Sequence, residues 1–260
     1  MKTPVLMYHE ITDRPVSEIP VEERPYAITN VEFDQQVAFL IQQGITTRFV
    51  NADQPNGGRS AVITFDDGHA SDVFAALPRL LNHGLKAEFY ITTGWIGKPG
   101  YVSRADIREL AAAGMVLGTH GVTHRYFDDL TEAELRLELL DSKSALEDIV
   151  GQGVFGGSAP GGRIHSHTQQ IASNLGYRYL CVSNADLADL RPAGEFQFVP
   201  RFAVNRNMPL EKYSRLASGD RRTVFLQNAR TTMLSYAKRA LGNRNYEVLR
   251  RRLLSGKKVD

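Results

Sequence analysis

The chain has 260 residues, of which 42% are hydrophobic and 23% are charged, with 31 Lys and Arg against 29 Asp and Glu. This composition is typical of a globular protein and excludes the disordered and fibrous classes. The single cysteine, Cys181, excludes an intrachain disulfide framework, and no run approaches the roughly 20 apolar residues of a membrane-spanning helix. The N-terminal residues lack the apolar segment of a signal peptide, which predicts a cytoplasmic protein.

Charge is unevenly distributed along the chain. Residues 220–260 carry eleven Lys and Arg against three Asp and Glu, a net charge of +8, whereas residues 1–219 carry a net charge of −6. Apolar side chains also recur at helical spacing in this last segment, beginning with Val224 and Phe225. We therefore divide the chain into a domain over residues 1–218 and a basic amphipathic helical tail over residues 219–260. Such a tail fits contact with the inner membrane surface, with a protein partner or with the first domain itself.

The first domain alternates short apolar runs with amphipathic stretches, which is the pattern of β/α units around a parallel sheet. Gly44 follows the first predicted helix, and Thr131 with Glu134 forms a capping box that opens the longest one. In such folds, functional residues gather at the C-terminal ends of the strands. The predicted strands cover 5–8, 61–65, 87–92, 115–118, 177–182 and 196–202, and the predicted helices cover 33–43, 73–83, 104–113, 131–149, 169–175 and 210–217.

Two adjacent carboxylates, Asp66 and Asp67, follow the second predicted strand and precede Gly68. At a strand end, a turn can bring both side chains to the same side of the sheet end, where one binds a metal ion and the other stays free as a base. A solvated turn is the alternative, since Asp-Asp-Gly is common turn chemistry.

Two imidazoles, His120 and His124, follow the predicted strand over 115–118. Their spacing places both rings on one side of a helical turn, although histidines that cap a loop would look the same in the sequence. Taken with the Asp66–Asp67 pair, they predict a zinc site of two imidazoles and one carboxylate with open positions for water. Such an open coordination shell is typical of a catalytic zinc site.

At these motifs the chain resembles the polysaccharide deacetylases, also called the NodB-homology family or carbohydrate esterase family four. Thr-Phe-Asp-Asp-Gly at 64–68 matches the family's first motif, and 120–124 matches its His-(Ser/Thr)-x-x-His motif with Gly121 in the Ser/Thr place. The resemblance covers most of residues 1–218 and implies an irregular (β/α)7 barrel. It also implies that Asp66 is the general base and that Asp67, His120 and His124 hold the metal.

The chain departs from the family at its third motif, Arg-x-Pro-(Phe/Tyr)-Gly. Ser158 stands in place of the Arg and Gly161 in place of the aromatic residue whose N–H helps to bind the oxyanion. Any residue except proline keeps that N–H, so Gly161 can still serve. Arg163 is our candidate for the missing charge and for substrate binding, against the alternative that Gly161–Arg163 is only a flexible turn.

The family's usual C-terminal Leu-x-x-His is absent, but Leu-Met-Tyr-His at 6–9 has the same form. This arrangement resembles the permuted deacetylases that act on poly-N-acetylglucosamine, and it makes His9 the candidate general acid. A buried histidine satisfied by a backbone carbonyl is the alternative. Arg201 lies near a strand end and could orient the acid and the base, but such a residue is more often part of ordinary packing, so we leave it out of the catalytic set.

The resemblance implies a metal-dependent hydrolase that removes N-acetyl groups from N-acetylhexosamine units of an exopolysaccharide or a lipid-linked glycan and releases acetate. Zinc is the expected ion, with cobalt and nickel as alternatives. Two other functions stay open: hydrolysis of a small amide, imide or ureide at the same metal site, and glycan binding without catalysis. Nucleic acid is not an expected partner, because the tail lacks a recognised module and interleaved aromatic residues.

Overall fold

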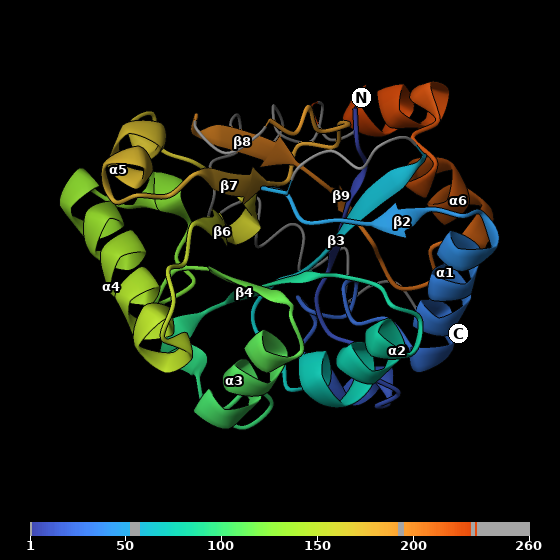
Figure 1. Cartoon of the computed structure of the whole chain (residues 1–260), viewed down its shortest axis with the longest axis horizontal. Helices are drawn as coiled ribbons and strands as arrows, with labels where there is room; N and C mark the ends of the chain where they lie inside the picture. The colour runs from blue at the N-terminus through green and yellow to red at the C-terminus, as the bar shows by residue number, and fades with distance from the viewer. Residues whose placement is uncertain (1, 53–57, 192–194, 230–231, 233–260) are drawn as a thin grey trace.

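The computed structural model describes residues 2–52, 58–191, 195–229 and 232, and Figure 1 shows strands surrounded by helices. The strands are β1 (Val5–Tyr8), β2 (Thr46–Thr47), β3 (Ser60–Phe65), β4 (Glu88–Ile91), β5 (Val116–Thr119), β6 (Gly156–Ser158), β7 (Tyr179–Val182), β8 (Gln197–Pro200) and β9 (Phe202–Ala203). The α-helices are α1 (Asn30–Gln42), α2 (Leu77–Asn82), α3 (Arg104–Ala112), α4 (Glu132–Val150), α5 (Thr168–Asn174) and α6 (Leu210–Ala217).

The strands form one curved sheet in the order β8-β7-β6-β5-β4-β3-β1-β9, with β2 paired to β3. Neighbouring strands are parallel, as the alternation of strands and helices along the sequence predicts. The two end strands, β8 and β9, are separated in sequence by Arg201 alone. One extended segment therefore pairs first with β7 and then with β1, and it brings the two edges of the sheet together. The predicted (β/α) barrel is confirmed in this nearly closed form.

Successive residues of a strand point to opposite faces, and the buried side chains separate accordingly. Leu6 and Ile63 pack with residues of α1, α2 and α3 on the outer face, whereas their neighbours Val5 and Val62 belong to a second cluster that includes no helix residue. This second cluster fills the barrel interior. The same alternation turns the residue after Phe65 toward the interior, at the end of β3 where the carboxylates lie.

Capping explains where the helices begin. Thr131 and Glu134 form the predicted capping box at the start of α4, and the same reciprocal arrangement opens α1 at Thr29 and α3 at Ser103. These helices are thereby fixed at their N-terminal ends, which lie near the C-terminal ends of the strands that precede them.

Three parts of the sheet differ from the sequence prediction, and the first is β2, a two-residue strand that was not predicted. β6 is a three-residue strand, Gly156–Ser158, whose two glycines carry no side-chain signal, and it was not predicted. The strand predicted over 196–202 is divided into β8 and β9 at Arg201. Of the predicted tail, residues 221–229 are helical and most of the remainder lies outside the described residues. No helix in the described part of the chain has the length and apolar character to cross a bilayer.

Candidate active site

The strand register brings the predicted site residues to one end of the barrel. β1 and β3 end in register, so His9 and Asp66 leave the sheet side by side. Thr119, the last residue of β5, pairs with Gly157 of β6, which places His120 next to Ser158. The C-terminal ends of parallel strands are where catalytic groups gather in barrel enzymes. Residues far apart in the sequence therefore meet here without any long loop.

Asp66 is a buried carboxylate held by a buried guanidinium. Arg201 Nη1 donates to Asp66 Oδ1 at 2.6 Å, and Nη2 donates to Oδ2 at 2.7 Å. Ser158 Oγ accepts from Arg201 Nη2 at 2.6 Å and donates to Asp66 Oδ2 at 3.1 Å. Burial alone would raise the pKa of Asp66, but the charges of Arg201 and His120 outweigh it and hold the pKa below its ordinary value. Asp66 is therefore ionised and fixed in orientation.

Asp67 faces imidazoles instead of a guanidinium. Its Oδ1 lies 3.3 Å from His120 Nε2 and 3.2 Å from His124 Nε2, and its Oδ2 lies 3.6 Å from His69 Nε2. Burial opposes ionisation here too, but the three imidazole contacts hold the pKa of Asp67 well below its ordinary value. The backbone of Asp67 has φ 77°, a left-handed conformation that non-glycine residues rarely adopt and that marks many functional sites.

The geometry of Asp67, His120 and His124 fits a metal ion. Their ligand atoms all lie within 4.8 Å of one another. The edge of a tetrahedron with bonds of about 2.0–2.1 Å measures about 3.3 Å, close to the two distances between Asp67 Oδ1 and the imidazoles. Asp67 Oδ1 is buried and has no hydrogen-bond partner among the described residues. A divalent cation would satisfy this oxygen and both imidazoles together.

The orientation of His120 suits metal ligation. Its Nδ1 lies 2.8 Å from the carbonyl oxygen of Ser158, which can only accept, so Nδ1 carries the proton. Nε2 is then the ring nitrogen that faces Asp67, and it is the atom that would ligate an ion there. Hydrogen bonding of the far ring nitrogen to a carbonyl is the usual way in which proteins orient a metal-ligating histidine.

The loop between the two imidazoles is held by Glu138 of α4. Its Oε2 accepts from the N–H of Val122 at 2.6 Å and of Thr123 at 3.0 Å. A Cβ at Gly121 would lie 2.8 Å from the same oxygen, and Gly121 has φ 73°. Glycine in the family's Ser/Thr place is therefore required by this clamp. His124 also has a left-handed backbone, with φ 62°.

His9 reaches the site from β1, as the resemblance implies, and its imidazole packs against Tyr26 with ring centroids 4.7 Å apart and the rings tilted by 32°. Its Nδ1 is buried and has no hydrogen-bond partner among the described residues. Burial lowers the pKa of His9 to about 4, even though the charges of Asp67 and Asp66 act to raise it. The ring is therefore neutral at pH 7 in the free protein. Its role as general acid stays a prediction.

Gly161 and Arg163 lie in a tight turn after β6. Gly161 has φ 61°, and a Cβ there would lie 2.7 Å from the ring of Tyr126. The ring of Tyr126 therefore occupies the space that an aromatic side chain at position 161 would need. Arg163 donates to Asp128 at 2.9 Å and stacks on Tyr126 at 4.3 Å. The hypothesis that Arg163 supplies the charge missing at Ser158 is wrong, because Arg201 occupies that place. Substrate binding by Gly161 and Arg163 stays a prediction.

Sequence reasoning undervalued Arg201 and missed Glu138 and His69. The position of Arg201 at a strand end was its only signal, because nothing in the sequence shows that β8 and β9 close the barrel beside β3. His69 had no evident partner in the sequence, yet its ring lies between Asp67 and Tyr101, with a ring-centroid distance of 5.2 Å to the latter.

Comparisons with known proteins agree with this geometry. Residues 53–180 match the family model described as polysaccharide deacetylase. YxkH of Bacillus subtilis, named as a polysaccharide deacetylase, is 26% identical over 184 residues, which cover 68% of this chain and 63% of that relative, less than two thirds of its length.

Two solved structures share the fold. The deacetylase PplD of Streptococcus pyogenes, in complex with acetate, superposes with a TM-score of 0.73 at 22% identity over 85% of this chain and 99% of that one. IcaB of Ammonifex degensii superposes with a TM-score of 0.66 at 24% identity over 83% of this chain and 95% of that one. The Asp66–Asp67 and His120–His124 motifs lie at the strand ends of such a barrel, and the match over residues 53–180 supports a place for this chain in the polysaccharide deacetylase family.

Proposed function

We propose that the protein is a metal-dependent hydrolase that removes N-acetyl groups from N-acetylhexosamine units of a poly- or oligosaccharide and releases acetate. The observation that carries the proposal is the placement of two ionised carboxylates with different partners. Asp67 lies among imidazoles that fit a metal ion, and Asp66 is held beside it by Arg201. Zinc suits this set of one carboxylate and two imidazoles, with cobalt and nickel as alternatives.

Two side chains carry out the two proton transfers of the proposed reaction, Asp66 as the base and His9 as the acid. Asp66, ionised and fixed by Arg201 and Ser158, takes the proton of the attacking water. A divalent ion bound by Asp67, His120 and His124 would acidify that water and polarise the acetyl carbonyl. His9 then donates to the leaving nitrogen. Because the pKa of His9 is about 4 in the free protein, this role requires its pKa to rise as negative charge develops on the substrate oxygen nearby.

Aromatic rings beside the imidazoles favour a sugar substrate over a small amide. Trp95 packs against His124 with ring centroids 4.9 Å apart and the rings tilted by 33°, and Tyr101 stacks on His69. Both aromatic side chains are only partly buried. Exposed aromatic faces can pack against the apolar faces of sugar rings, a contact that a small ureide or imide does not need. That the Streptococcus pyogenes deacetylase was solved with acetate, the product expected here, supports the proposal.

The proposal is tested by acetate release from N-acetylglucosamine oligomers, measured with the metal stripped and then restored. We expect release only with metal, and its loss in Asp66→Asn. Metal-dependent hydrolysis of small amides without any release from glycans would contradict the glycan substrate. Release that persists after the metal is stripped would contradict the metal-dependent mechanism. His9→Ala in the same assay tests the proposed acid, with a fall of about 10²–10⁴ expected.

A further inference from the structure

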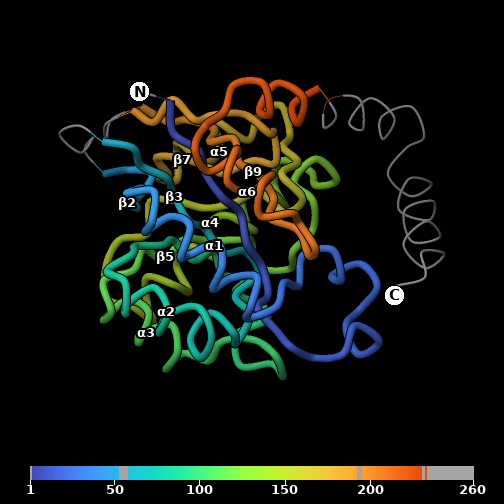
Figure 2. The backbone as a smooth tube through the Cα atoms, turned by 90° about the vertical axis from the view of Figure 1, so that its right-hand side faces the viewer, coloured from blue at the N-terminus to red at the C-terminus, as the bar shows by residue number. Residues whose placement is uncertain are grey.

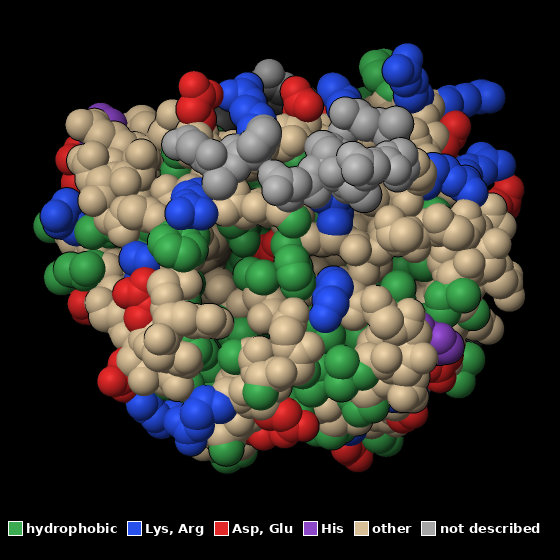
Figure 3. All heavy atoms as spheres, in the orientation of Figure 1, with side chains coloured by type: hydrophobic (Ala, Val, Ile, Leu, Met, Phe, Trp, Pro, Cys, Tyr) green, Lys and Arg blue, Asp and Glu red, His purple; other side chains and the backbone are tan. Residues whose placement is uncertain are grey.

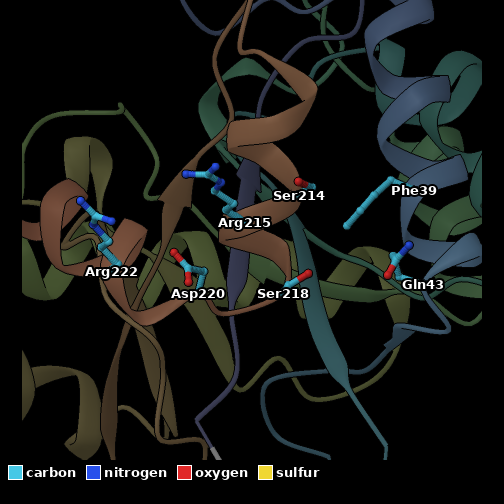
Figure 4. A pocket seen from close by; sticks show the side chains of 7 residues that line it. All are labelled: Phe39, Gln43, Ser214, Arg215, Ser218, Asp220 and Arg222. Atoms are coloured by element: carbon cyan, nitrogen blue, oxygen red, sulfur yellow. The ribbon is translucent and has the colours of Figure 1, made fainter.

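Cationic side chains gather at the end of the barrel where the strands begin. A cavity of about 360 Å³ beside the start of β1 and β3 is lined by Lys2, Arg59 and Arg221. A second cavity of about 480 Å³, between α1 and the turn after α6, is lined by Arg215 and Arg222 (Figure 4). Both cavities border the same turn, so one end of the molecule carries all five cations.

Few carboxylates compensate these charges. Arg215 is paired with Glu211 at 2.7 Å, and Asp220 accepts hydrogen bonds from Thr223 and interacts electrostatically with Arg215 and Arg222. Within the described residues, no carboxylate lies within salt-bridge distance of Lys2, Arg59, Arg221 or Arg222, and all four side chains are exposed. The positive charge at this end is thus largely uncompensated and open to solvent.

Apolar side chains lie on the same surface. The helix over residues 221–229 is anchored by Val224, which is 6% exposed and packs in the core. Phe225 and Leu226 are 71% and 60% exposed. They follow Arg221 and Arg222 by four residues, so each apolar side chain lies next to an arginine on the helix surface. Figure 3 shows Lys and Arg side chains gathered at the corner where this helix and α6 lie.

We propose that this basic face, formed by Lys2, Arg59, Arg221, Arg222, Phe225 and Leu226, docks the protein on an anionic lipid membrane. Charge complementarity and the exposed apolar pair point to the same partner. Cations draw the surface to acidic headgroups, and Phe and Leu side chains insert at the boundary between headgroups and acyl chains. A free anion would use only the cations. The residues that follow, 230–260, add nine Lys and Arg against two acidic residues.

Docking through this face leaves the active site free. The basic face lies at the N-terminal ends of the strands, whereas Asp66 and Asp67 lie at the C-terminal end of β3. Figure 2 shows the N-terminus and the helix after α6 at one end of the molecule, from which β1 runs toward the other end. A docked molecule therefore directs its active site away from the lipid. Lipid binding and acetate release can be measured independently for this reason.

The test uses the full chain with vesicles of phosphatidylcholine alone and of phosphatidylcholine with phosphatidylglycerol, and it measures the sedimented fraction over a range of salt concentrations. We expect binding to the anionic vesicles only, and weaker binding in high salt because exposed charges are screened. The double variant Arg221→Ala, Arg222→Ala should bind about 25-fold more weakly, about fivefold for each cation removed. Phe225→Ser with Leu226→Ser should weaken binding about tenfold.

The matched control is Arg136→Ala with Leu137→Ser on α4, which removes an exposed arginine and a leucine that is 55% exposed. It should bind vesicles like the unmodified protein. Equal binding to neutral vesicles, no binding to either kind, or unchanged binding by the Arg221/Arg222 variant would overturn the proposal. So would tighter binding to a duplex DNA oligomer than to anionic vesicles. Absent acetate release with intact vesicle binding would refute only the proposed catalysis.

Discussion

The two adjacent carboxylates of the site have opposite surroundings. Asp66 makes a bidentate pair with Arg201 and a further hydrogen bond with Ser158, so its neighbours are fixed cationic and hydroxyl donors. Asp67 is surrounded by imidazoles, and its Oδ1 has no hydrogen-bond partner in the described part of the chain. One carboxylate is already satisfied by the protein and the other still requires a cation. This difference supports the roles proposed for the pair, a base at Asp66 and a metal ligand at Asp67.

The comparison also shows how the fold assigns the two roles. Side chains after a strand alternate in direction, and the left-handed backbone at Asp67 turns its carboxylate toward the loop that carries the imidazoles. Asp66 keeps the inward direction set by β3 and meets the guanidinium at the point where the barrel closes. Environment rather than residue type therefore decides the chemistry of each carboxylate.

Isosteric replacement of each carboxylate gives the largest expected effects. Asp66→Asn should lower acetate release about 10²–10⁴-fold while metal binding persists, because only the base is lost. Asp67→Asn should remove the anionic ligand and with it tight metal binding. Metal content by atomic absorption and acetate release check both variants. Loss of the metal in Asp66→Asn and its retention in Asp67→Asn would contradict the roles assigned to the two carboxylates.

Removal of Arg201 should have the next largest effect. The pKa of Asp66 is lower in the folded protein than in the unfolded chain, where it is about 3.9. The ion pair therefore stabilises the fold fully at pH values above about 3.9, and this stabilisation is lost as the pH falls through the pKa of the folded protein. Arg201→Met leaves a buried carboxylate unpaired. We expect a loss of about 3–5 kcal/mol at pH 7 by chemical denaturation. The acid limb of kcat/KM should move up by about 1–3 pH units.

Arg163→Met is the matched control for Arg201. Its partners, Asp128 and Asp129, are exposed carboxylates, so its removal should cost less than about 1 kcal/mol and leave the acid limb in place. If the acid limb shifted more in Arg163→Met than in Arg201→Met, Arg163 and not Arg201 would be the cation that lowers the pKa of Asp66.

A change at Glu138 tests whether the loop that carries His120 and His124 must be held in place for metal binding. Glu138→Gln removes the charge that accepts the two backbone N–H groups between His120 and His124. We expect metal affinity to fall about 10–100-fold with little change in kcat at saturating metal. A metal titration followed by calorimetry measures this, with Glu134→Gln, on the same helix but in the capping box, as control. An unchanged affinity would show that Glu138 does not position the ligands.

Ser158→Ala tests the Asp66 side with the smallest change. The variant loses the hydroxyl that bridges Arg201 and Asp66 but keeps the backbone carbonyl that orients His120. We expect kcat to fall about tenfold, the value of one or two hydrogen bonds, with metal affinity unchanged. Steady-state kinetics at saturating metal gives the answer. A fall as large as that of Asp66→Asn would mean that the hydroxyl takes part in the chemistry.

Much of the fold could be predicted because local signals agree with it. Short apolar runs and helical spacing, with the capping box at Thr131, placed most strands and helices within a few residues of their observed bounds. β6 escaped prediction because its glycines have no hydrophobic pattern. The division between β8 and β9 was not predicted because the sequence of an extended segment does not show whether it pairs with one strand or with two strands in succession.

The residue types of the Asp66–Asp67 and His120–His124 motifs and their placement after apolar strands can be read from short-range spacing in the sequence. The contact of Arg201 with Asp66 and the hold of Glu138 on the imidazole loop arise only when the chain folds. The same is true of Tyr126, which fills the space next to Gly161. These contacts join residues that are distant in sequence, and pairing of that kind depends on which strands become neighbours when the barrel closes.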